Sequence, residues 1–251
     1  MDNKLGRAAY LTIGTTNVDT SMGLYEKLGF KRENEGSAPV RWTEICDGSL
    51  HIILVEGKDE YLGLTYVSDD IDSGIETLKA AGLRPVMTVG TEEAPRQVIA
   101  QIRPGVLVSI NQSRPDVDYN YVSKTLMDID FTNLTPENFP NSQCGIFGEL
   151  ALNINQLDAE IAFWEKIGFS VGEKNTMPYP WAIVSDGLFI IGLHETDEFD
   201  QPALTYFDLN MDEKIKNLQE TGVEFASIDN DNSGTINTPE GQRFFLFPLG
   251  Q

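Results

Sequence analysis

The sequence predicts an α+β fold built from four βαβββ modules, two in each of two homologous domains. Two observations support this prediction. The chain repeats itself, and each half of the repeat shows the same order of alternating apolar runs and amphipathic helices. Because single helices stand between groups of strands, we expect each sheet to carry helices on one face and to leave the other face open.

The repeat is found by shifting the chain against itself. A shift of 139 residues aligns residues 10–56 with residues 149–195 without a gap, with "YEKLGF" over "WEKIGF" and "CDGSLHII" over "SDGLFIIG". A shift of 140 then aligns "GLTYVSDDIDSGIETLKAAG" with "ALTYFDLNMDEKIKNLQETG". We therefore predict two domains, at residues 1–112 and 144–251, joined by a polar surface linker at residues 113–143.

The elements of the first module follow from local patterns. Residues 10–18 ("YLTIGTTNV") alternate and predict a strand. Residues 19–30 ("DTSMGLYEKLGF") predict a helix, with Asp19 as its N-cap and Gly29 at its C-terminal end. Further strand-like runs follow, among them "VRWTEIC" and "SLHIILVE". The order restarts at "YLGLTYVSDD", so we expect this unit four times.

Length and composition exclude several classes of protein. With 251 residues, 41% hydrophobic and 23% charged, the chain can bury a substantial core, and it has no apolar run long enough for a membrane span. The N-terminus lacks the pattern of a signal peptide, and Cys46 and Cys144 are too few for a disulfide framework. We expect a cytoplasmic protein that is a monomer or a homodimer.

The net charge of −21 is concentrated in the second half of the chain. Many of these acidic residues serve solubility. Such a surface also repels phosphate backbones and anionic lipids, which argues against nucleic-acid and membrane partners. It is compatible with a small-molecule ligand, including a cationic one.

Several segments together resemble the vicinal oxygen chelate superfamily, which includes glyoxalase I, bleomycin-resistance proteins and extradiol dioxygenases. They are the strand–helix units "TTNVDTSMGLYEKLGF" and "NINQLDAEIAFWEKIGF", the helix "DDIDSGIETLKAAG", and the turn and strand "TPEGQRFFLF". The resemblance covers nearly all of the chain except the linker. It implies two half-open, barrel-like sheets, each around a ligand cleft, with helices on the outer face.

Metal-dependent members of this superfamily bind a divalent ion with histidine, glutamine or glutamate side chains on the first and last strands of their modules. The matching residues here are Tyr10, Ile53, Gly63 and Ser109 in the first domain and Glu149, Gly192, Ala203 and Phe245 in the second. Only Glu149 is a strong ligand, whereas a catalytic ion needs about three. The resemblance therefore implies a tandem member that lacks the usual metal ligands, and we predict no metal cofactor.

Strand alternation predicts which side chains face the two clefts. Both sets are apolar to aromatic with a few polar anchors, which is typical of small-molecule pockets. Glu149 and His194 are the candidate catalytic residues, because a carboxylate and an imidazole on one face can act as an acid–base pair. The predicted ligand-binding residues are Tyr10, Thr12, His51, Ser109, Asn153, Arg243, Phe245 and Phe247.

Three functions are compatible with these observations. The one we favour is a metal-independent small-molecule-binding protein of the glyoxalase/bleomycin-resistance family that sequesters a cationic or aromatic compound. The second is a lyase or dioxygenase-type enzyme with an unorthodox site around Glu149 and His194. The third is a non-catalytic structural or regulatory module. The missing metal ligands favour the first and third over the second, and the aromatic open faces favour the first over the third.

Residues 229–240 ("DNDNSGTINTPE") match the spacing of an EF-hand calcium loop, with Asp229, Asp231 and Ser233 at the first three ligand positions. An EF-hand needs a helix on both sides, whereas extended segments flank this loop. Glu240 belongs to the turn "TPEG" and is badly placed to complete a calcium site. We therefore interpret the segment as a hairpin loop with at most weak Ca²⁺ binding at those three residues.

Overall fold

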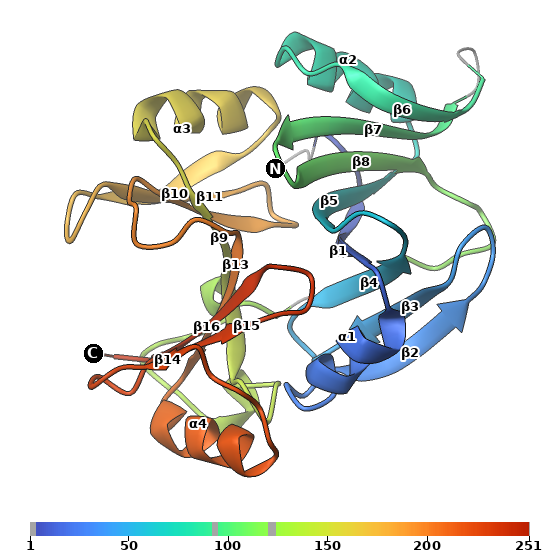
Figure 1. Cartoon of the computed structure of the whole chain (residues 1–251). Helices are drawn as coiled ribbons and strands as arrows, with labels where there is room; N and C mark the ends of the chain where they lie inside the picture. Colours follow the sequence, from blue (N-terminus) through green and yellow to red (C-terminus); the bar gives the residue numbers. More distant parts are fainter. Residues whose placement is uncertain (1–3, 92–94, 120–123, 251) are drawn as a thin grey trace. The chain divides into compact units, whose positions relative to one another are not determined.

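The computed structural model describes residues 4–91, 95–119 and 124–250 (Figure 1). Residues 120–123 of the predicted linker lie outside the described residues, as do residues 1–3, 92–94 and 251 of the two predicted domains. The described elements run in the order β, α, β, β, β four times. The predicted α+β class of four βαβββ modules is therefore confirmed.

The first repeat contains β1 (Ala8–Thr15), α1 (Val18–Tyr25), β2 (Lys31–Gly36), β3 (Trp42–Cys46), β4 (His51–Glu56), β5 (Tyr61–Ser68), α2 (Ile71–Ala80), β6 (Pro85–Gly90), β7 (Pro95–Arg103) and β8 (Val106–Gln112). The second contains β9 (Ile146–Asn153), α3 (Leu157–Lys166), β10 (Ser170–Asn175), β11 (Trp181–Ser185), β12 (Ile190–His194), β13 (Ala203–Asp208), α4 (Met211–Glu220), β14 (Ser227–Ile228), β15 (Gly234–Asn237) and β16 (Arg243–Pro248). Two short 3₁₀ helices, η1 (Leu126–Asp128) and η2 (Pro136–Asn138), lie between the repeats.

The strands form two eight-stranded sheets with the same topology. The first has the order β2-β3-β4-β1-β5-β8-β7-β6, and the second has the order β10-β11-β12-β9-β13-β16-β15-β14. In each sheet the first and last strands of one module pair in parallel, as β5 with β8 and β13 with β16. β14 is short and contains only Ser227 and Ile228. The two mixed sheets agree with the half-open sheets that the superfamily resemblance implies.

The chain divides into two compact units, each made of three segments. Unit 1 consists of Met1–Ile13, Tyr61–Tyr121 and Asn153–Phe199, and unit 2 of Gly14–Glu60, Val122–Leu152 and Asp200–Gln251. Each unit combines modules from both repeats. The domain boundaries predicted from the repeat, with a linker at residues 113–143, stay a prediction.

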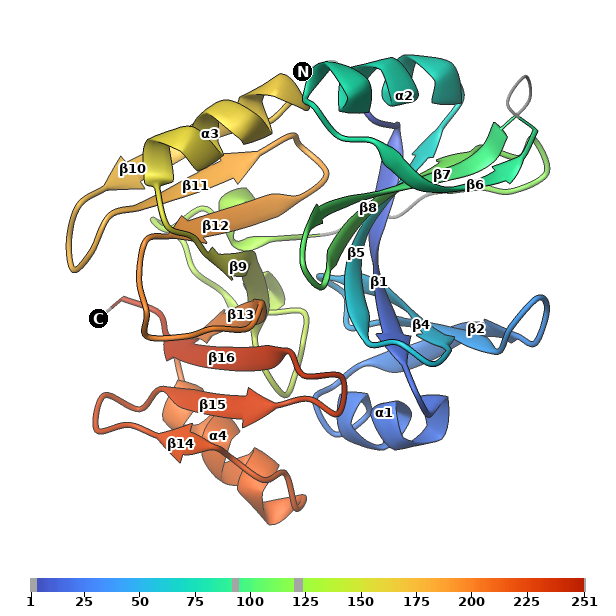
Figure 2. The same cartoon turned by 45° about the horizontal axis from the view of Figure 1, so that its top comes forward.

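In unit 1, α2 packs on β7 and β8, and α3 packs on β10, β11 and β12 (Figure 2). The buried Tyr66 on β5 joins the two parts of the unit, because its hydroxyl donates to Asp186 Oδ2 at 2.7 Å. The Tyr66 ring also lies edge-on to Phe189, with 5.3 Å between centroids. The core of this unit therefore contains residues from both repeats.

In unit 2, α1 packs against β4 and α4 against β16 (Figure 2). Tyr206 on β13 donates from its hydroxyl to Asp47 Oδ2 at 2.7 Å, and both residues are buried. The Tyr206 ring stacks on Phe244 at 5.5 Å, and Phe244 meets Tyr25 of α1 edge-on at 5.9 Å. An aromatic core therefore connects α1 of the first repeat with the last strand of the second.

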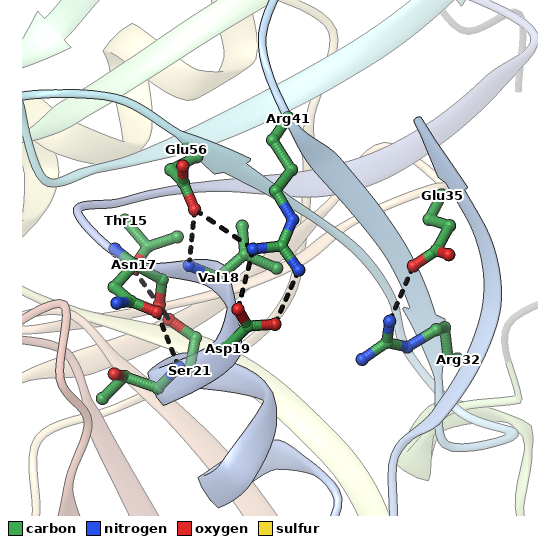
Figure 3. Close-up of polar contacts among 10 residues, drawn as sticks. Thr15, Asn17, Val18, Asp19, Ser21, Arg32, Glu35, Arg41 and Glu56 are labelled. Atoms are coloured by element: carbon green, nitrogen blue, oxygen red, sulfur yellow. Dashed lines mark hydrogen bonds and ion pairs between the residues drawn. The ribbon is translucent and has the colours of Figure 1, made fainter. Parts of the chain in front are cut away.

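The start of α1 differs from the prediction (Figure 3). The N-cap is Asn17, whose Oδ1 accepts a hydrogen bond from a backbone N–H of the first turn at 3.0 Å, and not Asp19. Asp19 lies in the first turn, where its carboxylate accepts two hydrogen bonds from Arg41 at 2.6 and 2.8 Å. Glu56 Oε2 accepts from the N–H of Val18 at 3.2 Å. The prediction of Asp19 as N-cap is therefore wrong by two residues, and Asn17 can take the role because asparagine caps a helix as well as aspartate does.

Asn141, at the end of the segment 113–143, is 1% exposed. Its Nδ2 donates to the carbonyl of Leu28 and to Asp47 Oδ2, both at 2.9 Å. This part of the connecting segment therefore belongs to the core of unit 2. Among the described residues, no helix combines the length and the hydropathy that a membrane span requires.

Candidate functional site

Three of the polar residues on the open face of the first sheet are hydrogen-bonded to one another in unit 1. Asn111 Nδ2 donates to the hydroxyl of Tyr10 at 3.1 Å, and Ser109 Oγ donates to Asn111 Oδ1 at 3.3 Å. Gln97 Nε2 on β7 extends the row by donating to Ser109 Oγ at 3.2 Å. Leu11, next to Tyr10, is fully buried on the opposite face. The predicted alternation of β1 is thus present, and it brings Tyr10 and Ser109 into one network.

Thr12 and Asn153, also predicted to bind ligand, have protein partners in unit 1. Thr12 Oγ1 shares a hydrogen bond with Thr65 Oγ1 at 2.7 Å. The carbonyl of Asn153 accepts from Arg103 Nη1 at 2.9 Å, and the same guanidinium pairs with Glu160 at 2.7 Å. The backbone of Asn153 therefore has a structural contact, while the ligand-binding prediction for its side chain stays a prediction.

In unit 2, the open face of the second sheet carries a row of three half-buried phenylalanines, which we call the aromatic row: Phe207, Phe245 and Phe247. Phe207 on β13 is in register with Phe247 on β16, and their ring centroids lie 5.6 Å apart. Phe245 lies 5.9 Å from Phe247. A Cβ atom at Gly148 would clash with the Phe207 ring, so this glycine leaves the room that the ring occupies. Two of these rings were predicted from the sequence.

Arg243 begins the strand that carries Phe245 and Phe247. Its guanidinium pairs with Asp200 at 2.8 Å, and its side chain is 29% exposed. In the register of β13 and β16, Arg243 is opposite Ala203. Arg243, Phe245 and Phe247 alternate with the buried Phe244 and Leu246, so the guanidinium lies on the face of the aromatic row, as the alternation predicted.

The two candidate catalytic residues belong to different units. Glu149 on β9 lies in unit 2, is 9% exposed, and donates its backbone N–H to Thr205 Oγ1 at 2.9 Å. His194 at the end of β12 lies in unit 1, where its ring meets Tyr179 and Phe199 edge-on at 5.9 and 5.7 Å. Their acid–base pairing therefore stays a prediction.

A second group of polar residues in unit 2 surrounds His51, and the sequence analysis identified only His51 itself. Ligand-type atoms of Glu33, Glu44 and His51, from β2, β3 and β4, all lie within 4.8 Å of one another. His51 Nδ1 is 3.8 Å from Glu33 Oε2. We call these three residues the Glu–Glu–His group.

Cys46 completes the surroundings of His51. Its Sγ lies 3.4 Å from His51 Nε2 and accepts the backbone N–H of Gly48 at 3.2 Å. Burial raises the pKa of the Cys46 thiol to about 11, so the thiol is neutral at physiological pH. Burial lowers the pKa of His51, and it raises the pKa of Glu44, with the nearby Glu33 carboxylate adding to that rise.

Alternation alone could have found part of the Glu–Glu–His group. Glu44 and Cys46 alternate with the buried Thr43 and Ile45, so they share the open face of β3. Glu33 could not be placed in this way, because the β2–β3 register shifts between its two neighbours. A bulge re-aims a side chain, and its position is not visible in a pattern of period two.

A depression of about 700 Å³ lies at the start of α2 in unit 1. Its lining includes Lys4, Arg7, Asp69, Asp70 and Asp186, so it carries both signs of charge. Arg7 pairs with Asp69 at 3.0 Å, which balances part of this charge internally. The sequence analysis did not single out this region.

In the segment that matches a calcium loop, residues 229–233 connect β14 to β15, and the residues that follow form β15 itself. Ser233 Oγ donates to Asp231 Oδ1 at 2.7 Å, and the Ser233 N–H donates to the same oxygen at 3.1 Å. These donors lower the pKa of Asp231. Glu240 is 3% exposed in the turn before β16, whereas Asp229 and Asp231 are exposed. The segment therefore has the flanking strands of a hairpin, and weak calcium binding stays a prediction.

Comparison with solved structures supports the fold, whereas comparison of sequences finds no match. No family model matches the chain, and no curated protein sequence matches it. Homoprotocatechuate 2,3-dioxygenase from Arthrobacter globiformis matches the structure with a TM-score of 0.61 at 14% identity, over 98% of this chain and 80% of the dioxygenase. The fold is therefore similar to that of this dioxygenase.

Structures of the Brevibacterium fuscum homoprotocatechuate 2,3-dioxygenase match in the same way. One variant has a TM-score of 0.60 at 12% identity, over 98% of this chain and 72% of the enzyme. The complex with 3,4-dihydroxyphenylacetate has a TM-score of 0.58 at 11% identity, over 98% of this chain and 86% of the enzyme. These similarities bear out the resemblance to the vicinal oxygen chelate superfamily at the level of fold.

Proposed function

We propose that this chain is a small-molecule-binding protein that holds an aromatic compound on the open face of its second sheet without using a metal ion. The observation that carries this proposal is the aromatic row of unit 2. Aromatic rings on a protein surface gain from stacking with another ring, and partly exposed rings are available for it. A function of the bleomycin-resistance kind, which is sequestration, needs nothing more than such binding.

Charge on the same face bears on the kind of compound. Glu149 places a carboxylate on β9, and Arg243 is already paired with Asp200. The chain as a whole has a net charge of −21. A cationic or neutral aromatic compound is therefore favoured over an anionic one, because the summed field of the protein attracts cations and repels anions. A cation can also rest on the ring faces.

The donor set at the superfamily's metal positions argues that binding is independent of metal there. In unit 2 these positions hold Ile53, Glu149, Ala203 and Phe245, of which only Glu149 can ligate. In unit 1 the hydroxyls of Tyr10 and Ser109 are held in hydrogen bonds to Asn111. This set does not fit a catalytic ion, which needs about three strong protein ligands.

The dioxygenases with the same fold act on a small aromatic compound, since one of the similar structures holds 3,4-dihydroxyphenylacetate. That compound is an anion, so it is a useful contrast to a cationic ring of similar size. We expect protonated phenethylamines to raise the melting temperature of this protein more than phenylacetates at equal concentration. Binding to the native state raises thermal stability in proportion to the logarithm of ligand concentration over Kd.

The test is a thermal-shift screen of cationic, neutral and anionic aromatic compounds in the presence of EDTA, followed by calorimetry on the best compound. Phe247→Ala is expected to weaken its binding at least about tenfold by removing one stacking ring. Phe131→Ala is the matched control, because Phe131 is a 57% exposed phenylalanine outside the aromatic row. If no compound in any class shifts the melting temperature, or both variants bind equally well, the proposal is wrong.

The enzyme alternative is favoured by one observation, the dioxygenase fold itself. It requires that Glu149 and His194 act on a bound compound. The discriminating measurement is product analysis after incubating the best-binding compound and 3,4-dihydroxyphenylacetate with the protein and Fe²⁺ in air. We expect both compounds to be recovered unchanged. Turnover that is lost in Glu149→Gln would favour the enzyme.

A further inference from the structure

The Glu–Glu–His group and Cys46 have counterparts in the second repeat with different chemistry. The backbone around the two sets is the same. β2 shifts register at Glu33 and β10 shifts at Gly172, and the pairs β3–β4 and β11–β12 have equivalent registers. The fold therefore forms without ligating side chains at these positions. The shift of 139 matches Glu33, Glu44, Cys46 and His51 with Gly172, Ile183, Ser185 and Ile190.

We propose that Glu33, Glu44 and His51 form a binding site for one divalent transition-metal ion, for which zinc is the best match. The site lies on the first sheet and uses none of the superfamily's metal positions. It is thus separate from the proposed compound-binding face on the second sheet and does not depend on it. Two carboxylate oxygens and one imidazole nitrogen from three adjacent strands supply the ligands.

The distances allow the site to close on an ion. Metal–ligand bonds of about 2.0 to 2.2 Å place neighbouring ligand atoms roughly 3 to 3.5 Å apart. The ligand atoms of the group lie within 4.8 Å of one another, and His51 Nδ1 and Glu33 Oε2 are 3.8 Å apart. Glu33 is 47% exposed and can move, whereas the His51 side chain is only 12% exposed and is held in place. The exposed Glu33 side chain can therefore rotate towards the fixed His51 ring.

The two carboxylates of the Glu–Glu–His group lack a neighbouring cationic side chain, and a bound cation would balance their charge. Among the residues that the structure describes, neither Glu33 nor Glu44 has a lysine or arginine nitrogen within 4 Å. Glu35, on the same strand, differs because it pairs with Arg32 at 2.6 Å (Figure 3). Two neighbouring carboxylates repel each other, whereas a cation bound between them attracts both.

His51 has the orientation of a metal-ligating imidazole. Nδ1 faces Glu33, and Nε2 faces Cys46 Sγ at 3.4 Å. A ligating histidine commonly gives its other N–H to a fixed acceptor, which sets the tautomer and the ring plane. Sγ is itself fixed by the N–H of Gly48 at 3.2 Å. Cys46 is therefore a positioning residue, which acts through His51.

The ligand types narrow the choice of ion. An imidazole with two carboxylates is the kind of set that zinc accepts, and three protein ligands leave one position for water. Calcium and magnesium prefer oxygen ligands alone, so the histidine disfavours them. Manganese and cobalt fit the same donors, with affinities that follow the general order for divalent ions.

The experiment uses ¹⁵N-histidine-labelled protein, because the chain has two histidines, His51 and His194. Zinc chloride is titrated into metal-free protein, and calorimetry gives the stoichiometry and Kd. We expect one ion per chain, with the imidazole signals of His51 shifting and those of His194 staying in place. His51→Ile assigns the signals, and it reproduces the residue of the second repeat, so that variant is expected to fold.

Glu44→Ile and His51→Ile should each weaken zinc binding at least about tenfold, and Glu35→Gln should leave Kd unchanged. The inference is overturned if zinc, cobalt and manganese all bind with Kd above about 1 mM, or if the folded His51→Ile variant binds zinc as wild type does. A zinc-dependent shift of His194 instead of His51 would also overturn it. Since no compound is added, failure here is independent of failure of the proposed compound binding.

Discussion

Each unit contains the same kind of buried contact between a tyrosine and an aspartate. The repeat that supplies the tyrosine in one unit supplies the aspartate in the other. In unit 1, Tyr66 of the first repeat donates to Asp186 of the second at 2.7 Å. In unit 2, Tyr206 of the second repeat donates to Asp47 of the first, also at 2.7 Å. Each aspartate also accepts backbone N–H groups of its own Asp-Gly turn. Contacts that hold modules together are thus retained in both copies.

The buried contacts are the same in both units, whereas the open faces of the two sheets differ. The first sheet carries the Glu–Glu–His group, and the second has glycine and isoleucines at the equivalent positions. The second sheet carries the aromatic row, whose rings Phe245 and Phe247 are matched on β8 by Ser109 and Asn111. The comparison indicates that the buried side has a common structural task, whereas the side chains on the two open faces differ in chemistry.

The largest effect is expected from removing a retained contact. Asp47 accepts hydrogen bonds from Tyr206, Asn141, Ser49 and the backbone of Leu50. Asp47→Ala leaves these buried donors without an acceptor, so we expect the free energy of unfolding to fall by about 4 kcal/mol or more. Urea unfolding followed by circular dichroism measures the change.

Asp186→Ala is the matched variant in unit 1 and should also lower the free energy of unfolding, by about 2 kcal/mol or more. Both variants retain the open-face residues, so compound and zinc binding should persist in the folded fraction. If either substitution costs less than about 1 kcal/mol, the duplicated contact does not hold its unit together.

The second prediction concerns alkaline pH. Burial, followed by the neighbouring aspartate, raises the pKa of Tyr66 and of Tyr206 well above the usual value of 10. Above pH 10 the unfolded phenols ionise while the folded ones stay neutral, so stability is fully present below pH 10 and falls as pH rises beyond it. Each tyrosine should contribute a slope of about 1.4 kcal/mol per pH unit.

Urea unfolding at intervals between pH 9 and 11 gives this slope. Tyr66→Phe and Tyr206→Phe should each reduce it by one such contribution, and their effects should add, because the two residues lie in separate units. An unchanged slope in both variants would show that these phenols do not remain neutral in the folded protein.

The sequence predicted the order of elements and the open faces because both depend on local periodicity. Leu11 is buried between Tyr10 and Thr12, as a period of two requires. One error is local: α1 begins at Val18, so Asn17 occupies the cap position and Asp19 lies in the first turn, where it pairs with Arg41. The sequence does not indicate which modules form one compact unit, because the contacts that join them are far apart in the chain. Tyr66 and Asp186, for example, are 120 residues apart.

The candidate site was predictable in part for the same reason. Phe245, Phe247 and Arg243 follow from strand alternation on β16. Glu33 does not, because the shift in register at the bulge has no signature in the sequence of β2. The aligned pair Glu44 and Ile183 was the available signal, since a charged residue over an apolar one marks a position where the repeats have diverged.

The third prediction concerns a variant in which Glu44, on the open face of the first sheet, is replaced by isoleucine, the residue at the equivalent position of the second repeat. In metal-free protein, Glu44→Ile removes a half-buried carboxylate that Glu33 repels, so we expect the free energy of unfolding to rise by up to about 1 kcal/mol. Saturating zinc should reverse the order, because only wild type gains from binding. A loss of more than about 1 kcal/mol without metal would mean that Glu44 has a structural task.

The smallest effect is expected at Cys46, which the second repeat replaces by Ser185. If Cys46 only orients His51, a serine hydroxyl can accept the same imidazole N–H, and Cys46→Ser should keep zinc affinity within about threefold of wild type. Cys46→Ala removes the acceptor and should weaken binding roughly tenfold, as loss of an orienting partner does. Calorimetry with zinc chloride on both variants, with unfolding curves as a control for folding, separates these cases. Should Cys46→Ser lose as much affinity as His51→Ile, the sulfur itself ligates the ion, and the first sheet would hold a four-ligand site with no position left for water.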